Sequence, residues 1–171
     1  MKFEIVHTFK NVTVDQYIKL FFDETFNEAL RATAALKSRE VLEKKEENGK
    51  LYRKVRVVPS VDLPGAIKPM LKGGELSYLE ITTMDWARKV QTFETQVNVT
   101  DKVKISGEVH FLAAPGGGVL RKLLFDVSAS IFGLSGIIEK STRDQMIPTY
   151  DKIAAFTQKW IDDGKAAALA S

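Results

Sequence analysis

The feature that most restricts the fold of this chain is an alternation of apolar and polar side chains with a period of two residues. In residues 102–112, one side of the alternation consists of Val103, Ile105, Gly107, Val109 and Phe111. The other side consists of Lys102, Lys104, Ser106, Glu108 and His110. A period of two is typical of a β-strand that buries one face. Repeated strands of this kind predict an antiparallel sheet with one packed face and one wet face.

Six further segments favour strands. The predicted set comprises residues 2–10, 38–46, 51–59, 75–84, 89–99 and a last strand that follows Gly118 and ends near Ile131. Asn48-Gly49 joins the second strand to the third, because both residues accept the positive φ of a type I′ hairpin turn. Gly107, in the middle of its strand, is a candidate site for a bend in the sheet.

Helical periodicity occurs near both ends of the chain. Thr13 and Gln16 have capping-box spacing, and the apolar residues that follow predict two short helices before residue 34. A long helix is predicted from about Leu134 to Asp163, with Pro148 inside it as a source of a kink. Its apolar stripe comprises Ile138, Met146, Tyr150, Ile153, Phe156 and Trp160.

Length and composition favour one globular domain. We expect residues 1–163 of the 171 to form it and residues 164–171 to be a flexible tail. A net charge of +3 does not demand a nucleic-acid partner, so we expect none, and we expect a monomer. The absence of cysteine excludes disulfides and thiolate metal sites, and it suits the reducing cytoplasm. No apolar stretch approaches the ~20 residues that span a bilayer, and charge interrupts the N-terminus too early for a secretory signal.

The predicted order is a strand, two short helices, six strands and a long helix, which is the α+β helix-grip arrangement. It implies a seven-stranded, curved antiparallel sheet around the C-terminal helix. Within that helix, Gly136-Ile137-Ile138-Glu139-Lys140 and Phe156-Thr157-Gln158-Lys159-Trp160-Ile161 resemble a bacterial START-like family. The chain therefore resembles the START-like (SRPBCC) superfamily of lipid and hydrophobic-ligand binders. The resemblance implies a cavity for sterols, other lipids, aromatic polyketides or similar molecules, with no cofactor.

One long helix cannot fill the concave side of a bent sheet, and a void of that size is stable only if a ligand occupies it or its walls are stiff. The predicted lining of the cavity consists of Ile67, Met70, Leu71, Leu79, Ile81, Phe93, Phe111, Phe125, Met146, Tyr150 and Ile153. The alternative is that these side chains form a solid core.

Three residues are candidate polar anchors for a ligand. His7 shares a face with Phe3 and Phe9, and it is either an anchor or a hydrogen-bonded core histidine. The hydroxyl of Tyr150 needs a partner if it is buried, and a ligand hydroxyl could supply one. Arg53 either reaches a ligand carboxylate or extends along apolar surface to the sheet edge, and we expect the latter.

The sequence shows no catalytic or metal-binding constellation. Its two histidines, His7 and His110, do not have recognised metal-site spacing, and no Ser-His-Asp order has local motif support. Gly116-Gly117-Gly118 is not a phosphate loop, because no Lys-Ser/Thr pair follows and a strand comes next. We expect this glycine run to be a hairpin turn.

The segment 60–74 lacks strand alternation and is rich in proline and glycine. Strand parity places it at the same end of the sheet as the turn near residue 100 and the start of the long helix, so we expect the cavity to open there. Two interpretations of its apolar residues are open. Ile67, Met70 and Leu71, beside Lys68 and Lys72, either touch a membrane transiently or pack onto the core.

These expectations favour a carrier or sensor of a hydrophobic small molecule, a sterol or another lipid, rather than an enzyme. An enzyme of the polyketide cyclase or aromatase kind is the alternative, with Tyr150, His7 and Arg53 as its polar groups. A protein-interaction module is the third class, and the charged outer positions of the sheet argue against it.

Overall fold

The computed structural model describes residues 1–63, 65, 67–71 and 73–167. The strands are β1 (Lys2–Phe9), β2 (Leu36–Glu47), β3 (Lys50–Pro59), β4 (Tyr78–Asp85), β5 (Val90–Val97), β6 (Val103–Ala113) and β7 (Val119–Ala129). The helices are α1 (Val14–Phe22), α2 (Glu24–Leu30), the 3-10 turn η1 (Lys68–Met70) and α3 (Ser135–Asp162). The predicted element order is confirmed.

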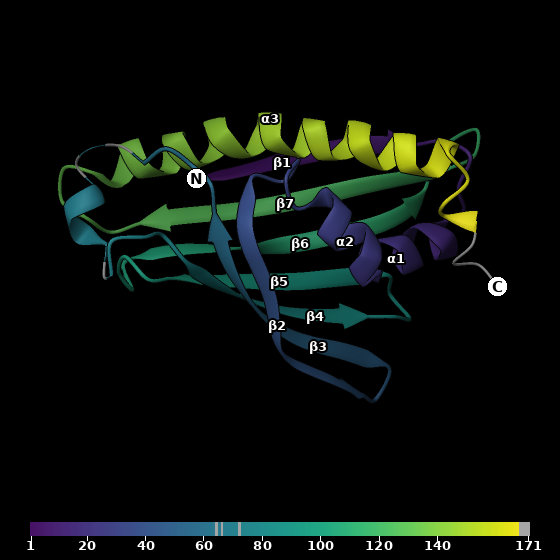
Figure 1. Ribbon diagram of the computed structural model, residues 1–171, viewed down its shortest axis with the longest axis horizontal. Coiled ribbons are helices and arrows are strands. Elements are labelled where there is room, and N and C mark those ends of the chain that lie inside the picture. Colours follow the sequence, from purple (N-terminus) through teal and green to yellow (C-terminus); the bar gives the residue numbers. More distant parts are fainter. Residues whose placement is uncertain (64, 66, 72, 168–171) are drawn as a thin grey trace.

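The seven strands form one antiparallel sheet in the order β1-β7-β6-β5-β4-β3-β2. Strands that follow one another in the chain are neighbours, except that β1 pairs with β7 and so brings the N-terminus beside the last strand. The helix α3 runs along the sheet next to β1 and β7, and α1 and α2 lie over the same face, as Figure 1 shows. This is the expected helix-grip arrangement, with a curved sheet around the C-terminal helix.

Local sequence signals account for the two short helices. Thr13 accepts a hydrogen bond from the Gln16 amide, and the Gln16 side chain accepts one from the Thr13 amide, which is the predicted capping box. Asp23 ends α1 and caps α2, because its carboxylate accepts a hydrogen bond from the Phe26 amide at 2.8 Å. The chain therefore turns a corner at Asp23 and carries Glu24 into the first turn of α2.

The β2–β3 hairpin closes at the predicted turn, where Asn48 and Gly49 have φ values of 53° and 72°. The pairing of β2 with β3 shifts register between Leu36 and Ser38 and again between Val41 and Glu43. Such irregularities increase the local twist of a strand. They help to curl this edge of the sheet toward α2.

Gly107 lies where two strands and an aromatic ring meet. A Cβ atom at this position would stand 1.8 Å from the Leu124 carbonyl oxygen and 2.8 Å from Cζ of Phe93. Only glycine allows β6 to approach its neighbours this closely. The position expected to bend the sheet is therefore one of close backbone approach.

The helix α3 continues unbroken through Pro148. Thr142 and Thr149 donate side-chain hydrogen bonds to the carbonyl oxygens of Ile138 and Gln145, each one turn earlier. A kink at Pro148 stays a prediction.

Buried apolar side chains form two clusters. The main cluster joins α1, α2 and the end of α3 to the sheet, with Tyr17, Leu20 and Ile161 among its members. The second lies at the other end of α3, where Ile67 and Ile138 pack together with Val99 and Ala129. The segment expected to be a flexible tail from Gly164 packs as far as Ala166, which is 2% exposed in the main cluster, because the chain turns back after α3. Residues 168–171 lie outside the described part of the chain.

Candidate binding pocket

A pocket of about 370 Å³ lies between the inner face of the sheet and α3. This volume falls within the range of small-molecule sites, roughly 300–1,000 Å³. Its walls on α3 extend from Ile138 to Ile153, about 22 Å at a rise of 1.5 Å per residue. The pocket is therefore elongated along the helix, and it lies between the two buried clusters.

Aromatic rings form one wall of the pocket. Phe125 on β7 packs against Phe93 on β5 and Tyr150 on α3, with ring centroids 5.3 and 5.7 Å away. Phe3 on β1 stacks on Phe125 at 5.0 Å. These contacts join sheet and helix through ring geometries that aromatic pairs favour. Because three strands and α3 contribute rings to this stack, we expect this wall of the pocket to be stiff.

Six of the eleven residues predicted to line a cavity line this pocket: Ile67, Phe93, Phe125, Met146, Tyr150 and Ile153. Phe111 instead packs under α1, with its ring 5.1 Å from that of Phe21 and 6.0 Å from that of Tyr17. Met70 packs against the second cluster, and Leu71 lines a neighbouring surface depression. That any of these residues binds a ligand stays a prediction.

Leu79 and Ile81 lie on the outer face of β4 and do not line the pocket. The inner face of this strand carries Tyr78, Glu80 and Thr82, and the first two line the pocket. The prediction places this apolar pair on the inner face of β4, whereas in the structure the pair lies on the outer face. Strand register could have identified Glu80 as an inward-facing residue. Glu80 pairs with Val55 on β3 and with Thr95 on β5, and both of these residues face inward.

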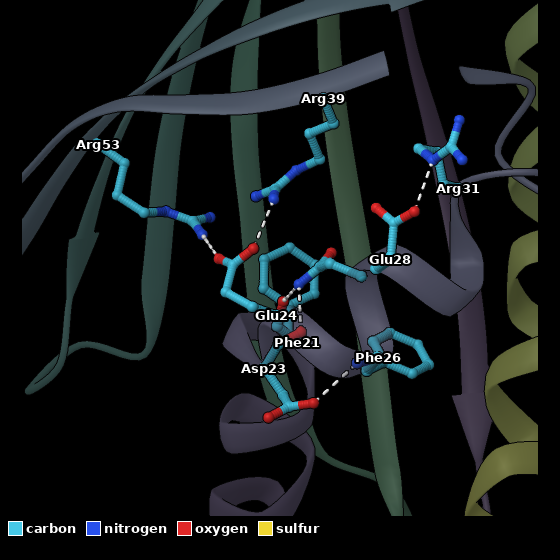
Figure 2. Close-up of polar contacts among 9 residues, drawn as sticks. Phe21, Asp23, Glu24, Phe26, Glu28, Arg31, Arg39 and Arg53 are labelled. Atoms are coloured by element: carbon cyan, nitrogen blue, oxygen red, sulfur yellow. Dashed lines mark hydrogen bonds and ion pairs between the residues drawn. The ribbon is translucent and has the colours of Figure 1, made fainter. Parts of the chain in front are cut away.

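Arg53 points inward, so the expectation that it extends to the sheet edge is wrong. Its side chain is 4% exposed, and its guanidinium stacks over the ring of Phe22 at 4.6 Å. Glu24, at the start of α2, offers one carboxylate to two arginines, as Figure 2 shows. The distances from its oxygens are 2.8 Å to Arg39 Nη1 and 3.8 Å to Arg53 Nη1. Nε of Arg53 has no hydrogen-bond partner within the described residues.

Burial shifts the pKa values of this cluster. Desolvation raises the pKa of the Glu80 carboxyl, against the opposing effect of Arg53 and Arg39. Desolvation also lowers the pKa of Arg53, and nearby Arg39 adds to this effect. The pKa of Tyr150 rises to about 12, first through burial and then through the charge of Glu80. The pKa of Tyr78 is raised by the same two causes, so both phenols stay protonated at neutral pH.

His7 lies outside the pocket lining and already has protein partners. Its Nε2 is 2.8 Å from the Asp151 carboxylate, and its Nδ1 is 3.1 Å from Nη2 of Arg121. Arg121 also donates to the Tyr17 hydroxyl at 3.0 Å. This network ties β1 and β7 to α1 and α3. The alternative of a hydrogen-bonded histidine, left open by the sequence, describes His7 better than a ligand anchor.

Three apolar residues of segment 60–74, Ile67, Met70 and Leu71, pack inward, whereas Val61 is exposed. Ile67 is 8% exposed, and Met70 and Leu71 pack against the same cluster. Lys72, predicted to meet anionic head groups, lies outside the described residues. A surface depression beside this segment shares four lining residues with the pocket, namely Pro59, Val61, Leu63 and Leu76. The pocket therefore approaches the surface at the end of the sheet that carries this segment.

The site can hold an apolar molecule and offer it a few polar groups. In the part of the chain that the structure describes, no group of three or more His, Cys, Asp or Glu side chains could bind a metal ion. The same residues include no helix long and apolar enough to cross a membrane.

Comparison with known proteins assigns the chain to a family. A family model described as a protein of unknown function, DUF2505, matches residues 4–161. The chain belongs to the DUF2505 family. Among curated proteins, no match to this DUF2505 chain is found.

Three solved structures show how widely the DUF2505 fold is shared. The protein TTHA0849 from Thermus thermophilus matches with a TM-score of 0.67 and 15% identity, over 96% of this chain and 99% of that one. The Zhui aromatase/cyclase from Streptomyces sp. R1128 matches with a TM-score of 0.61 and 16% identity, over 100% and 96% of the chains. A START superfamily protein from Mycobacterium smegmatis matches with a TM-score of 0.60 and 9% identity, over 95% and 97%. The DUF2505 chain therefore has the START-like (SRPBCC) fold.

Proposed function

We propose that this DUF2505 protein binds a hydrophobic small molecule, a sterol or another lipid, in the pocket between sheet and α3. It acts as a carrier or sensor in the cytoplasm, as a monomer and without nucleic acid. The observation that carries the proposal is the elongated, mostly apolar pocket between two separately packed clusters. Binding of an apolar ligand in this pocket is favourable by about 25 cal/mol for each Å² of apolar surface that it buries.

Mass spectrometry of organic extracts from the purified protein tests this function, together with titration of a fluorescent apolar probe. We expect a co-purified lipid or saturable probe binding near one molecule per chain. Displacement of the probe by sterols or by acyl lipids then separates these two classes. A protein that carries no lipid and binds no apolar probe contradicts the proposal.

The proposal includes transient contact with a membrane at the end of the molecule that holds segment 60–74. Ile67, Met70 and Leu71 are packed, but Phe132, in the connection from β7 to α3, is fully exposed. Ile137 and Val61 are also exposed at this end, and Lys68 and Lys140 are exposed cations beside them. An exposed aromatic residue with nearby lysines suits the surface of an anionic bilayer.

An enzyme of the polyketide cyclase or aromatase kind is the second candidate. It is favoured by the polar groups that line the pocket, because proton transfer needs such groups within reach of a substrate. Glu80 and Tyr150 are the acid and base candidates here. Incubation with a reactive polyketide chain, followed by product analysis, separates the two functions, since a carrier returns the bound molecule unchanged.

A further inference from the structure

Three polar groups that line the pocket have no hydrogen-bond partner among the described residues. Tyr78 and Glu80 come from β4, and Tyr150 comes from α3 on the opposite wall. The hydrogen bonds among the described residues include none to the Glu80 carboxylate or to the hydroxyls of these two tyrosines. Tyr78 and Glu80 are two residues apart on the inner face of β4, about 7 Å along the strand, and the charge of Glu80 also acts on both tyrosines. Polar groups in an apolar site are costly unless hydrogen-bonded, so they favour a ligand that supplies those bonds.

The arginines of this region are already engaged. Arg39, which lines the pocket, binds Glu24 at 2.8 Å, and Arg53, which does not line it, shares the same carboxylate (Figure 2). Both guanidinium groups also act to lower the pKa of Glu80, so they lie within electrostatic range of two carboxylates, those of Glu24 and Glu80. An ammonium group on a ligand would add a third cation to this cluster, and a carboxylate on a ligand would lie beside the carboxyl of Glu80.

A hydroxyl group matches these three side chains. It donates one hydrogen bond, which Glu80 can accept, and it accepts hydrogen bonds, which the tyrosine hydroxyls can donate. A carboxylate only accepts and an ammonium only donates, so each leaves one side of the subsite unsatisfied. A hydroxyl also adds no charge to a region where burial already disfavours ions.

We propose that Tyr78, Glu80 and Tyr150 form a subsite for the hydroxyl head group of an otherwise apolar ligand. The pocket therefore selects long-chain or polycyclic alcohols over fatty acids and amines. This inference rests on the proposed function and adds to it the chemical class of the ligand.

Gln91 offers a competing position in the same pocket. It is 4% exposed, and its Oε1 has no partner among the described residues. On β5 it lies four residues from Thr95, which pairs with Glu80, or about 13 Å along the strand. Its single amide offers fewer convergent groups than the Glu80 subsite, and substitution of each residue distinguishes the two positions.

The test compares a long-chain alcohol with the fatty acid and the amine of the same chain length. Each competes with a fluorescent apolar probe for the intact protein, below the concentration at which it forms micelles. We expect the alcohol to bind wild type about tenfold more tightly than either charged analogue. This is the difference in affinity that one or two buried hydrogen bonds would produce. Glu80→Leu should remove this preference, and Tyr150→Phe should reduce it. Glu80→Gln should keep alcohol binding within about threefold, since an amide both donates and accepts.

Glu94→Gln is the matched control, because Glu94 lies on β5 with its side chain on the exposed outer face. It should leave all three affinities unchanged, and circular dichroism checks that each variant is folded. Equal binding of the three analogues overturns the subsite and leaves the proposed function standing. A preference for the acid, or an amine preference that Glu80→Gln abolishes, overturns the hydroxyl assignment. Loss of the alcohol preference in Gln91→Leu but not in Glu80→Leu overturns the location.

Discussion

Gly107 on β6 pairs with Phe93 on β5, and a Cβ atom on Gly107 would lie 2.8 Å from Cζ of that ring. The glycine thereby leaves room for the aromatic stack that forms one wall of the pocket.

Gly107→Ala should destabilise the protein by about 1–3 kcal/mol or more, because the added methyl group also meets the Leu124 carbonyl oxygen at 1.8 Å. Urea unfolding measures the change in the free energy of unfolding. Gly136→Ala is the matched control. Gly136 lies in α3, and a methyl group added there would meet no atom within 4 Å apart from its own turn of the helix, so alanine should stabilise by about 0.5–1 kcal/mol. Equal stability of wild type and Gly107→Ala would contradict the close approach.

The raised pKa of Glu80 predicts a pH-dependent gain in stability for Glu80→Gln. Below the ordinary value of 4.5 the carboxyl is protonated in both the folded and unfolded states, so the pKa shift contributes no difference. Above 4.5 the unfolded chain releases the proton more readily than the folded one, so wild type loses stability as pH rises to the folded pKa. Each unit of elevation corresponds to about 1.4 kcal/mol.

Urea unfolding of wild type and Glu80→Gln between acid and neutral pH measures this effect. The stability of Glu80→Gln relative to wild type should rise from pH 4.5 upward and then level off. A difference that falls over the same range would mean that the attraction of Arg53 and Arg39 outweighs desolvation.

Glu24→Ala should destabilise the protein more than Glu28→Ala. Both residues lie on α2 and pair with arginines (Figure 2), but Glu24 contacts the buried Arg53, whereas Glu28 pairs with the partly exposed Arg31. Removal of a partner from a buried cation costs about 1–3 kcal/mol, and an exposed ion pair contributes about 0–1 kcal/mol. Thermal and urea unfolding of the two variants compares the effects. Equal losses would indicate that water already solvates Arg53.

Phe132→Ser should weaken binding to anionic vesicles roughly tenfold if this end of the molecule meets a bilayer, since a buried Phe contributes about 1.5–3 kcal/mol. Co-sedimentation with anionic and with zwitterionic vesicles measures the loss. Leu112→Ser is the matched control, because Leu112 is an exposed apolar residue at the end of β6, near the Gly116 turn. If wild type binds neither kind of vesicle, membrane contact is excluded while ligand binding is unaffected.

The elements fixed by short-range signals could be predicted from the sequence. Thr13 and Gln16 form the expected capping box, and Asn48-Gly49 makes the expected turn, because each signal acts within four residues. Which side chains of β4 point inward could not be predicted in the same way. A long segment rather than a tight turn joins β3 to β4, so local geometry does not set their register. The sequence pattern therefore predicts Leu79 and Ile81 on the inner face of β4. In the structure, Tyr78 and Glu80 lie on that face.

The polar part of the site was harder to predict because its partners are distant in the sequence. Arg53 is buried because Glu24 and Phe22 meet it from the helical segment near the N-terminus. Nothing in the alternation around Arg53 indicates a partner on another element. His7 was placed on the correct face, but its bonds to Arg121 and Asp151 depend on strands and a helix from the other end of the chain.

The helix α3 is fixed to the domain near its two ends, at Ile138 and at Ile161, while the turns between them cover the pocket. Met146 and Tyr150, in those middle turns, line the pocket and also pack against the main cluster, so substitutions there change both the lining and the packing of α3 on the sheet. Three solved structures keep this fold at identities of only 15%, 16% and 9% to this chain, so the architecture tolerates wide changes in sequence.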